Sequence, residues 1–546
     1  MNARTIVVLL ALIAAAGGSA AQSDFGPGGL FALAERCMAC HNGLVAPDGL
    51  DVSIGGNWRA SMMAHSSRDP YWQAAVRRET IDHPSAVAVI EDECAVCHMP
   101  MSRFLAAGDG RRGEIFAHLP LAAARSPTAR LAGAGVSCTV CHQVRADGLG
   151  EPDSFTGGFV IDRATPLGGR DIFGPFDVDE GRTAVMRSAS RFEPARADHV
   201  QSSELCATCH TLYTHALGPD GEVVGELPEQ VPYLEWRHSD FSGRRSCQSC
   251  HMPEVAGEMA ITGVLGQPRA AFSRHVFRGG NFLMPRIFNR FADELEPRAL
   301  PEELDTASRR TAEHLQTSSA EVRIAAAGLA GDRLELSVEL VNLAGHKLPT
   351  AYPSRRAWLH LEVADRDGRP VFSSGALRPD GAVAGNDNDA DPRRFEPHHE
   401  VISKPEEVQV YEAVMVDPDG RVTTGLLSAV RFVKDNRLLP SGFDPATADP
   451  DIAVQGGAAA DPDFSGGSDR VRYRVEVDPG VAPFRVTAKL WYQPVGFRWA
   501  RNLADYDADE PRRFVRMFDA LSASSAVVLA GAEATVTANP SVEGQE

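Results

Sequence analysis

The pentapeptide Cys37-Met38-Ala39-Cys40-His41 sets a pattern, C-x-x-C-H, that recurs four more times before residue 252. The chain has 10 cysteines, and the five copies contain all of them, so no thiol is left for a disulfide bond or a lone nucleophile. We number the copies motif 1 to motif 5 in chain order, the later four being Cys94-Ala95-Val96-Cys97-His98, Cys138-Thr139-Val140-Cys141-His142, Cys206-Ala207-Thr208-Cys209-His210 and Cys247-Gln248-Ser249-Cys250-His251.

The spacing within each motif suits the attachment of c-type haem. Two thiols about one helical turn apart can each form a thioether with a haem vinyl group, and the next imidazole then reaches the iron as proximal ligand. Four-cysteine zinc sites and redox dithiols also use C-x-x-C, but neither requires a histidine after the second cysteine. The sequence predicts five covalent haems, with attachment at Cys37, Cys40, Cys94, Cys97, Cys138, Cys141, Cys206, Cys209, Cys247 and Cys250 and proximal ligands His41, His98, His142, His210 and His251.

The first 255 or so residues resemble the multihaem c-type cytochromes, a group that includes pentahaem nitrite reductases and octahaem hydroxylamine oxidoreductases. Besides the motifs, Glu235-Trp236 and the stretch Cys250-His251-Met252-Pro253 are similar to that group. Pentahaem nitrite reductases carry a lysine in place of histidine at the catalytic motif, and no C-x-x-C-K occurs in this chain. The resemblance therefore implies the cofactors of the group without implying that particular activity.

The second axial ligands are less constrained than the proximal ones. A haem used for electron transfer normally has two strong ligands, whereas a catalytic haem keeps one position open. Twelve histidines lie outside the motifs, and any single one is as readily an ordinary polar residue as a ligand. Within the haem region the histidines to consider are His65, His83, His118, His199, His215, His238 and His275, of which His118, His199, His238 and His275 are the predicted distal ligands, together with Met63 and His346.

Met63 and His346 are included for different reasons. In Trp58-Arg59-Ala60-Ser61-Met62-Met63, Met63 occupies the place of a ligating histidine in the related pattern Trp-x-x-Ser-x-His-Ala, but methionine also commonly fills gaps in cores. His346 stands in Gly345-His346-Lys347-Leu348-Pro349, at the end of a predicted strand. This loop either presses an imidazole against a haem across a domain interface or simply caps its own strand.

Length and charge limit the class of protein. A chain of 546 residues should hold two to four domains, and 43% hydrophobic residues are ample for packed cores. The formal net charge of −19 argues against a nucleic-acid partner. It suits cationic or small redox partners, or serves solubility alone.

The N-terminus predicts a secretory signal peptide over residues 1–21. Arg4 supplies a positive charge, Ile6 to Ala16 is an apolar run, and Ser19-Ala20-Ala21 offers small residues for cleavage. Eleven apolar residues are too few to span a bilayer, and no later stretch reaches the length of a transmembrane helix. We expect an exported protein of the periplasm or the cell exterior that does not span the membrane.

The remaining chain divides by its periodicity. We predict an α+β, multidomain protein: a mainly α-helical and irregular pentahaem domain over 22–280, a helical connector over 281–320, a β-sandwich domain over 321–535 and a flexible tail over 536–546. The sandwich is predicted from alternating apolar residues such as Leu334, Leu336, Val338 and Leu340.

One acidic segment inside the predicted sandwich starts like a calcium loop. Asp387, Asp389 and Asp391 stand at alternate positions, but Pro392 replaces the glycine that such a loop needs next. We therefore predict a solvated acidic loop without a metal.

These observations favour an exported cytochrome that relays electrons through its haems. Two alternatives stay open: an oxidoreductase that acts on a small nitrogen or sulfur compound at one open haem, and a subunit of an extracellular cytochrome filament. The expected partners are redox proteins or a small redox substrate, and the sequence leaves open an oligomer or filament.

Overall fold

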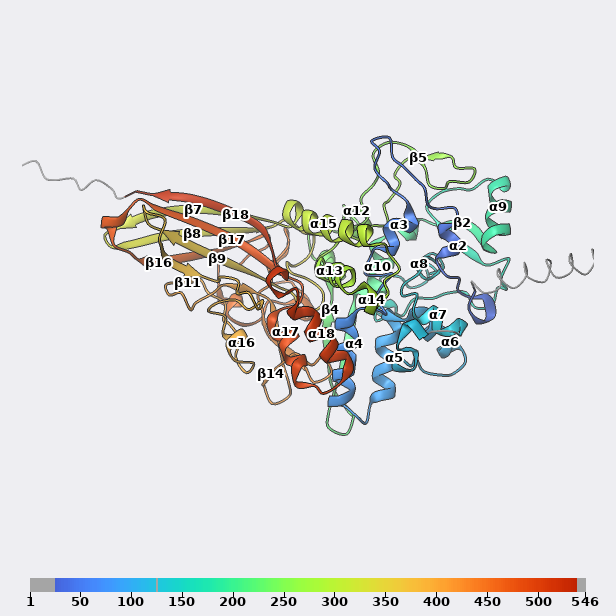
Figure 1. Cartoon of the computed structure of the whole chain (residues 1–546), viewed down its shortest axis with the longest axis horizontal. Coiled ribbons are helices and arrows are strands. Elements are labelled where there is room, and N and C mark those ends of the chain that lie inside the picture. The colour runs from blue at the N-terminus through green and yellow to red at the C-terminus, as the bar shows by residue number, and fades with distance from the viewer. Residues whose placement is uncertain (1–24, 124–125, 538–546) are drawn as a thin grey trace, which may run out of the picture.

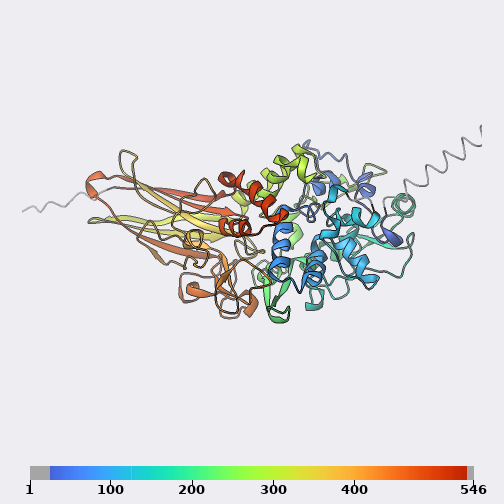
Figure 2. The same cartoon turned by 60° about the horizontal axis from the view of Figure 1, so that its bottom comes forward.

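The computed structural model describes residues 25–123 and 126–537 (Figure 1). The predicted signal peptide and most of the predicted tail lie outside the described residues. Short helices and irregular chain fill one end of the molecule and long β-strands fill the other, an arrangement visible in both views (Figures 1 and 2). It confirms the predicted α+β, multidomain class.

The first lobe, residues 25–280, is built from short helices, and a helix carries at least part of each of the five motifs. Several helices begin at a proline, whose missing N–H costs nothing in the first turn; Asp69 also caps its helix by accepting from the backbone N–H groups of Tyr71 and Trp72. The helices are α2 (Glu35–Met38), α3 (Ile54–Arg59), α4 (Pro70–Asp82), α5 (Val87–His98), α6 (Pro100–Gly108), α7 (Pro127–Ala132), α8 (Cys138–Cys141), α9 (Glu180–Ser190), α10 (Ser203–His210), α11 (Pro232–Arg237) and α12 (Cys247–His251).

Small two-stranded sheets and single 3₁₀ turns complete this lobe. The pairs are β1 (Asp171–Gly174) with β2 (Glu193–Arg196), β3 (Leu212–Leu217) with β4 (Val223–Gln230), and β5 (Met259–Ala260) with β6 (Pro268–Arg269). The 3₁₀ turns are η1 (Pro27–Gly29), η2 (Phe116–His118), η3 (Leu121–Ala123), η4 (Pro152–Ser154) and η5 (Asp198–Gln201).

Three helices follow in the segment 281–320: α13 (Leu283–Arg290), α14 (Ala292–Leu295) and α15 (Pro301–Ser318). Helix α13 is apolar on its inner side, where Leu283, Met284, Ile287 and Phe288 are fully buried. These side chains belong to the same hydrophobic cluster as the strands that follow. The segment therefore packs into a core that the β-rich lobe shares with residues of the first lobe such as Tyr71 and Leu234.

Two sheets of the β-rich lobe face each other across that core. Val338 pairs with Val471 in one sheet and Leu359 with Leu490 in the other, and all four are fully buried. In the described chain, the first sheet has the strand order β10 (Pro370–Ser374), β9 (Arg356–Ala364), β17 (Phe484–Gln493) and β18 (Val527–Val536), and β12 (Val410–Tyr411) also pairs with β9. The second sheet has the strand order β11 (Val401–Ile402), β16 (Ser468–Glu476), β8 (Arg333–Asn342) and β7 (Ala320–Ala330).

The inner residues alternate with outer ones along each long strand, as the sequence pattern predicts. On β8, Leu334, Leu336, Val338 and Leu340 are all buried. A smaller sheet beside the sandwich has the strand order β14 (Val422–Thr423), β13 (Ala413–Val416) and β15 (Arg431–Asp435). The short helices of this lobe are α16 (Asp387–Ala390), α17 (Phe497–Arg501) and α18 (Asp509–Asp519). Its 3₁₀ turns are η6 (Pro450–Ile452), η7 (Gly456–Ala460), η8 (Pro479–Val481), η9 (Asn502–Asp505) and η10 (Ser522–Ser524).

The prediction of a solvated acidic loop holds only in part. Asp389 is buried: its side chain is 3% exposed and forms an ion pair of 2.8 Å with Arg356, which is 4% exposed. It also accepts from the backbone N–H of Val383. The sequence pattern missed this because Arg356 comes from a strand far away in the chain.

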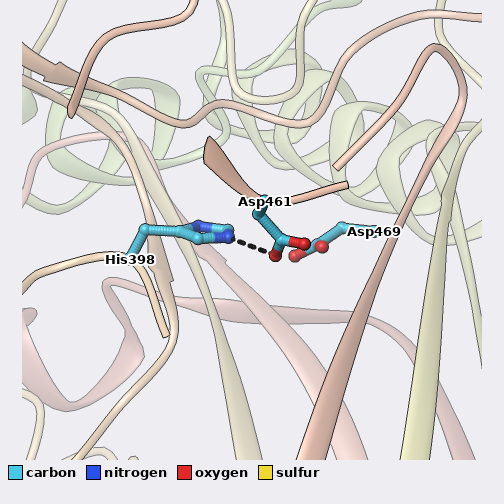
Figure 3. Close-up of side chains that lie close together, drawn as sticks. All are labelled: His398, Asp461 and Asp469. Carbon is cyan, nitrogen blue, oxygen red and sulfur yellow. Dashed lines mark hydrogen bonds and ion pairs between the residues drawn. The ribbon is translucent and has the colours of Figure 1, made fainter. Parts of the chain in front are cut away.

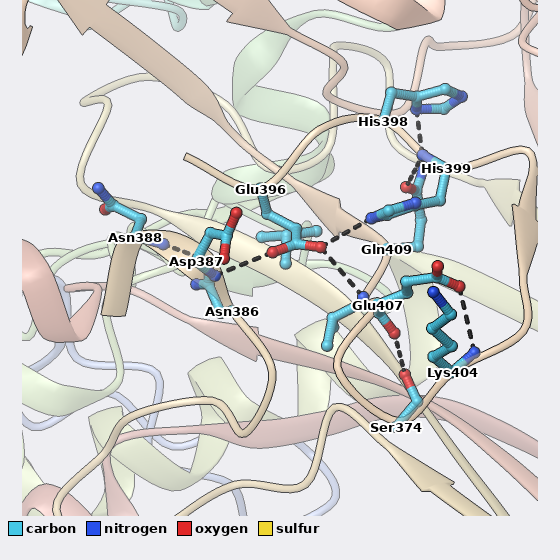
Figure 4. Close-up of polar contacts among 12 residues, drawn as sticks. Ser374, Asn386, Asp387, Asn388, Glu396, His398, His399, Lys404, Glu407 and Gln409 are labelled. Carbon is cyan, nitrogen blue, oxygen red and sulfur yellow. Dashed lines mark hydrogen bonds and ion pairs between the residues drawn. The ribbon is translucent and has the colours of Figure 1, made fainter. Parts of the chain in front are cut away.

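The loop around residues 386–409 is held by carboxylates (Figure 4). Glu396 accepts from the backbone N–H of Asp387 at 2.9 Å and bonds the His399 ring at 2.7 Å. Glu407 accepts from the backbone N–H groups of Ser403 and Lys404. The polar composition of this segment thus serves to satisfy its own backbone.

The two lobes meet along α4 and α18, which lie side by side in Figure 1. Arg77 of α4 pairs with Glu510 of α18 at 2.9 Å. The buried carboxylate of Glu79 accepts from the backbone N–H groups of Leu426 and Leu427. None of the helices in the described chain has the length and apolar character that crossing a bilayer requires.

Candidate haem-binding sites

The five motifs present the donor set that the sequence predicts. All ten thiols are free of disulfide bonds. Four of the five motif histidines are fixed by a hydrogen bond from Nδ1 to a backbone carbonyl, which leaves Nε2 as the nitrogen available to a metal. The bonds are His41 to Ile261 (2.8 Å), His98 to Ser66 (3.0 Å), His142 to Phe173 (2.6 Å) and His251 to Arg278 (2.5 Å).

Burial lowers the pKa of His98, His142, His210 and His251 and so favours the neutral imidazole, which is the form that binds a metal. It lowers the pKa of His98 to about 4 and that of His251 to about 4, with His346 adding to the effect at His251. The residues present therefore fit a haem at each motif.

Two motif histidines face a second imidazole. The rings of His142 and His275 have centroids 6.2 Å apart and planes inclined by 18°, and those of His251 and His346 are 6.2 Å apart and inclined by 15°. Because a metal–imidazole bond is about 2 Å long, two imidazoles on opposite sides of one ion have ring centres about 6 Å apart. Both pairs have the spacing of two axial ligands.

The distal partner in each pair also has its Nδ1 engaged. His275 bonds the carbonyl of Ser273 at 3.1 Å, and His346 bonds the carbonyl of Lys347 at 2.9 Å. Burial, with His142 adding to it, lowers the pKa of His275 to about 3. In each pair, Nε2 is the nitrogen left on both rings.

The other predicted distal ligands lie elsewhere. His199 directs Nε2 at the carbonyl of Val144 (2.7 Å), and His238 directs Nε2 at that of Asp444 (3.0 Å). His118 is half-buried at the end of η2, and Met63 is half-buried with its carbonyl bonded to the backbone N–H of Val136. Over residues 25–123 and 126–537, none of the three histidines has its ring against a motif histidine.

His65, one of the histidines considered, has both ring nitrogens occupied. Nδ1 bonds the carbonyl of Ser61 at 2.9 Å, and Nε2 accepts from the backbone N–H of Arg298 at 3.1 Å. The fully buried ring also packs on Phe288. His65 therefore joins α13 to the first lobe and has no lone pair to give to iron.

The sequence did not single out His314, which lies beside motif 5. Its ring centroid is 6.4 Å from that of His251, with planes inclined by 75°, and its Nδ1 is buried without a hydrogen-bond partner. Burial, with Arg278 and the other two histidines adding, lowers its pKa to about 4. No motif marks position 314, and only the packing of α15 over motif 5 brings it there.

Thiols of different motifs touch each other, and the contacts order the motifs in space. A hydrogen bond between Cys37 and Cys138 lowers the pKa of the first and raises that of the second, so motif 1 adjoins motif 3. Similar bonds join Cys97 to Cys209 and Cys206 to Cys247, and the latter lowers the pKa of Cys247 to about 7.

Motif 4 is therefore the centre of the arrangement. It contacts motif 2 through Cys209 and motif 5 through Cys206. Burial raises the pKa of Cys141 in motif 3 to about 12, and the neighbouring Cys209 adds to that rise. All five motifs thus form one connected group, branched at motif 4.

A buried ion network fixes the loop of His346 to the first lobe. Lys347 pairs with Asp435 at 2.7 Å, Arg437 pairs with the same carboxylate at 2.7 Å, and Arg437 also pairs with Glu235 of α11 at 2.8 Å. All four groups are almost fully buried. Although burial opposes it, Arg437 and Lys347 hold the pKa of Asp435 well below its usual value.

A second cluster of metal-binding residue types lies in the β-rich lobe (Figure 3). His398, Asp461 and Asp469 place ligand atoms within 4.8 Å of one another. His398 Nε2 lies 3.0 Å from Asp461, while its Nδ1 lies 2.8 Å from the Gln409 amide and 3.1 Å from the Asn436 amide.

The amide orientations decide what this cluster can do. Gln409 Oε1 accepts from the backbone N–H of His399, and Asn436 Oδ1 accepts from that of Glu412, so both NH₂ groups point at His398 Nδ1. Nδ1 must then accept, and the ring proton sits on Nε2 and is donated to Asp461. This imidazole has no free lone pair, so the cluster is a hydrogen-bond network rather than a metal centre.

Comparison with known proteins bears on the fold of the chain. No known protein family matches the chain, and no curated protein matches it significantly. The chain is similar to the solved structure of a penta-heme cytochrome c552 from Thermochromatium tepidum, with a TM-score of 0.52 and 16% sequence identity over 93% of this chain and 99% of that one. The chain thus has the fold of a multihaem cytochrome, the class that its five motifs predict.

Proposed function

We propose that the protein is an exported pentahaem c-type cytochrome that relays electrons through five covalently attached haems. The observation that carries the proposal is the proximity of thiols from different motifs. Hydrogen bonds between thiols join motif 1 to motif 3 and motif 4 to motifs 2 and 5, and Cys209 of motif 4 lies near enough to Cys141 of motif 3 to raise its pKa. Haems attached to touching motifs are close neighbours, as electron transfer between them requires. When bound, the haem irons supply one-electron redox chemistry.

The chain's own residues hold and orient the haems. The ten motif cysteines provide the thioether links, and the motif histidines provide one ligand each. His275 is the proposed second ligand at motif 3, and His346 is the proposed second ligand at motif 5. His346 comes from the β-rich lobe, which gives that lobe a direct role in the redox domain.

A second candidate function is an oxidoreductase reaction at motif 4. In the described chain, no second imidazole packs against the rings of His41, His98 or His210. Of these, His210 has its pKa lowered by burial and then by the guanidinium of Arg355. A cation near an open coordination position suits a small nitrogen or sulfur oxyanion. The branch point of the motifs would then be the site of reaction.

Intact mass of the mature protein tests the haem count. We expect the chain without its signal peptide plus five haems, when the protein is made in a host with c-type haem maturation machinery. A mass with four haems or fewer contradicts the proposal. An EPR spectrum of the oxidised protein then separates the two functions, because an open haem gives a high-spin ferric signal and a fully ligated set does not.

The His346→Ala variant tests the link between the lobes. We expect one haem to change from low spin to high spin. The matched control is His360→Ala, since His360 lies on β9 of the same lobe and only approaches the Ser373 hydroxyl at 3.5 Å. Identical haem spectra in both variants would reduce His346 to a structural residue of its loop.

A further inference from the structure

Three guanidinium groups gather beside motif 5. The nearby carboxylates, Glu313 beside Arg278 and Arg310 and Asp48 and Asp51 beside Arg274, act on them only at a distance and form no ion pair with them in the described chain. Arg274 and Arg278 lie in the loop after β6, and Arg310 lies on α15; all three are half-buried. Arg274 and Arg310 both donate to the side-chain oxygen of Asn57, at 3.5 and 3.1 Å. One neutral oxygen therefore holds two of the three cations.

Arg278 is fastened to motif 5 itself. Its Nε donates to the carbonyl of Cys250 at 2.9 Å, and its own carbonyl accepts from His251 Nδ1 at 2.5 Å. These two hydrogen bonds hold the Arg278 guanidinium against motif 5, which is proposed to carry the haem. Arg274 Nε is buried and lacks a hydrogen-bond partner.

Among the residues that the structure describes, no carboxylate forms an ion pair with any of these three arginines. At Arg310, burial and then the neighbouring charges of Arg274 and Arg278 lower the pKa to about 10. Some other half-buried arginines of the chain do form ion pairs, as with Arg59 and Glu303 or Arg77 and Glu510. Like charges held together out of water are costly unless an anion neutralises them.

We propose that Arg274, Arg278 and Arg310 form an anion site that takes the propionate carboxylates of a haem at the edge of motif 5. The proposal rests on the proposed haem binding. Guanidinium groups match carboxylates with two parallel hydrogen bonds, and several guanidiniums can serve the two propionates of one porphyrin. The shared chemistry is a carboxylate or oxyanion, and a free oxyanion from solution is the other source that the test must separate.

The site has a consequence for the redox chain. Cations at the propionates favour the reduced haem, whose iron carries one positive charge fewer. The cluster therefore raises the midpoint potential of its haem relative to a haem with unpaired propionates. Removing one arginine should lower that potential without removing a ligand of the iron.

The test measures the five midpoint potentials by spectroelectrochemistry in the haem-loaded full chain and in the Arg310→Gln variant. The control is Arg309→Gln, the adjacent residue on α15, because Arg309 is exposed and pairs with Asp305 at 2.9 Å. We expect one haem to shift to a lower potential in Arg310→Gln, no shift in Arg309→Gln, and a shift largely reversed in Arg310→Lys, which restores the charge. Arg274→Gln serves as the second variant if Arg310→Gln folds poorly.

Two results would overturn the proposal. One is a set of potentials that is the same in Arg310→Gln and Arg274→Gln as in Arg309→Gln. The other is a wild-type protein whose potentials move with added inorganic phosphate, with that dependence lost in Arg310→Gln, since the site then binds a free anion. The haem count from intact mass on the same samples is a separate readout, so a loss of haem in the wild type would contradict the proposed function and not this site.

Discussion

The two lobes bury their apolar residues in different ways. In the β-rich lobe, strands from both sheets and helix α13 share one large cluster. In the helical lobe, most of the buried residues belong to separate small clusters, and these lie against the motifs, with Cys94 at one, Cys138 at another and Cys209 at a third.

This difference indicates which lobe needs a cofactor in order to fold. A large continuous core is stable through side-chain packing alone, whereas small separate clusters leave a domain marginal unless something else fills the space between them. Haem faces at the motifs would join the small clusters into one core. We expect the β-rich lobe to fold without haem and the helical lobe to need it.

The strongest test is the chain made in cells that lack haem-attachment machinery. We expect residues 25–280 to be digested rapidly by a protease while 281–537 resist, because only the second part has a continuous core. Limited proteolysis with mass spectrometry of the surviving fragment gives the boundary. Equal resistance of both parts to the protease would contradict the view that only the helical lobe needs haem to fold.

Within the helical lobe, motif 4 should matter more than motif 1, because its thiols contact those of motifs 2 and 5. The double variant Cys206→Ala with Cys209→Ala should lose one haem and most of the soluble yield. Cys37→Ala with Cys40→Ala should also lose one haem but retain more soluble protein. Intact mass and yield from parallel cultures decide this, and equal yields would remove the central role of motif 4.

We expect the next largest effect from the buried ion network around Asp435. Asp435→Asn leaves Lys347 and Arg437 buried without their shared carboxylate, so we expect unfolding of the β-rich lobe to become easier by about 3–5 kcal/mol. The matched control is Asp419→Asn, whose carboxylate is exposed and pairs with an exposed Arg421, and it should cost at most about 0.5 kcal/mol. Denaturant titration of both variants measures the difference, and similar midpoints would contradict it.

The smallest effect concerns pH. Burial raises the pKa of Glu229 to about 7, against a hydrogen bond from Thr214 and with Glu79 nearby. Since the folded state then binds a proton that the unfolded state has released, stability should fall as the pH rises from about 4.5 to about 7, by at most about 3 kcal/mol.

Glu229→Gln removes this dependence. The variant should be the more stable protein above pH 7 and lose that advantage near pH 4.5. Thermal unfolding across this pH range checks the sign, with Glu226→Gln on the same strand as an exposed control. A variant that is less stable than the wild type at pH 8 would show that Glu229 is stabilised by its surroundings when charged.

The sequence alone determined the features that depend on neighbouring residues. Thioether chemistry needs only two cysteines and a histidine within five positions, so the motifs and the class of protein followed directly. Successive side chains of a strand point alternately to the buried and the exposed face of a sheet, so the alternating apolar residues also predicted the β-rich lobe. Pro301 likewise stands at the first position of α15, where proline favours the start of a helix.

Only the tertiary structure decided the contacts between distant segments. It places His346 and His275 beside motif histidines, whereas His65 and His199 form hydrogen bonds with backbone groups. It also places His314, which no motif marks, beside His251. It also buries Asp389 against Arg356. The physical reason is that an imidazole or carboxylate has the same local sequence whether it meets a metal, a cation or water, and only the packing of the chain chooses among them.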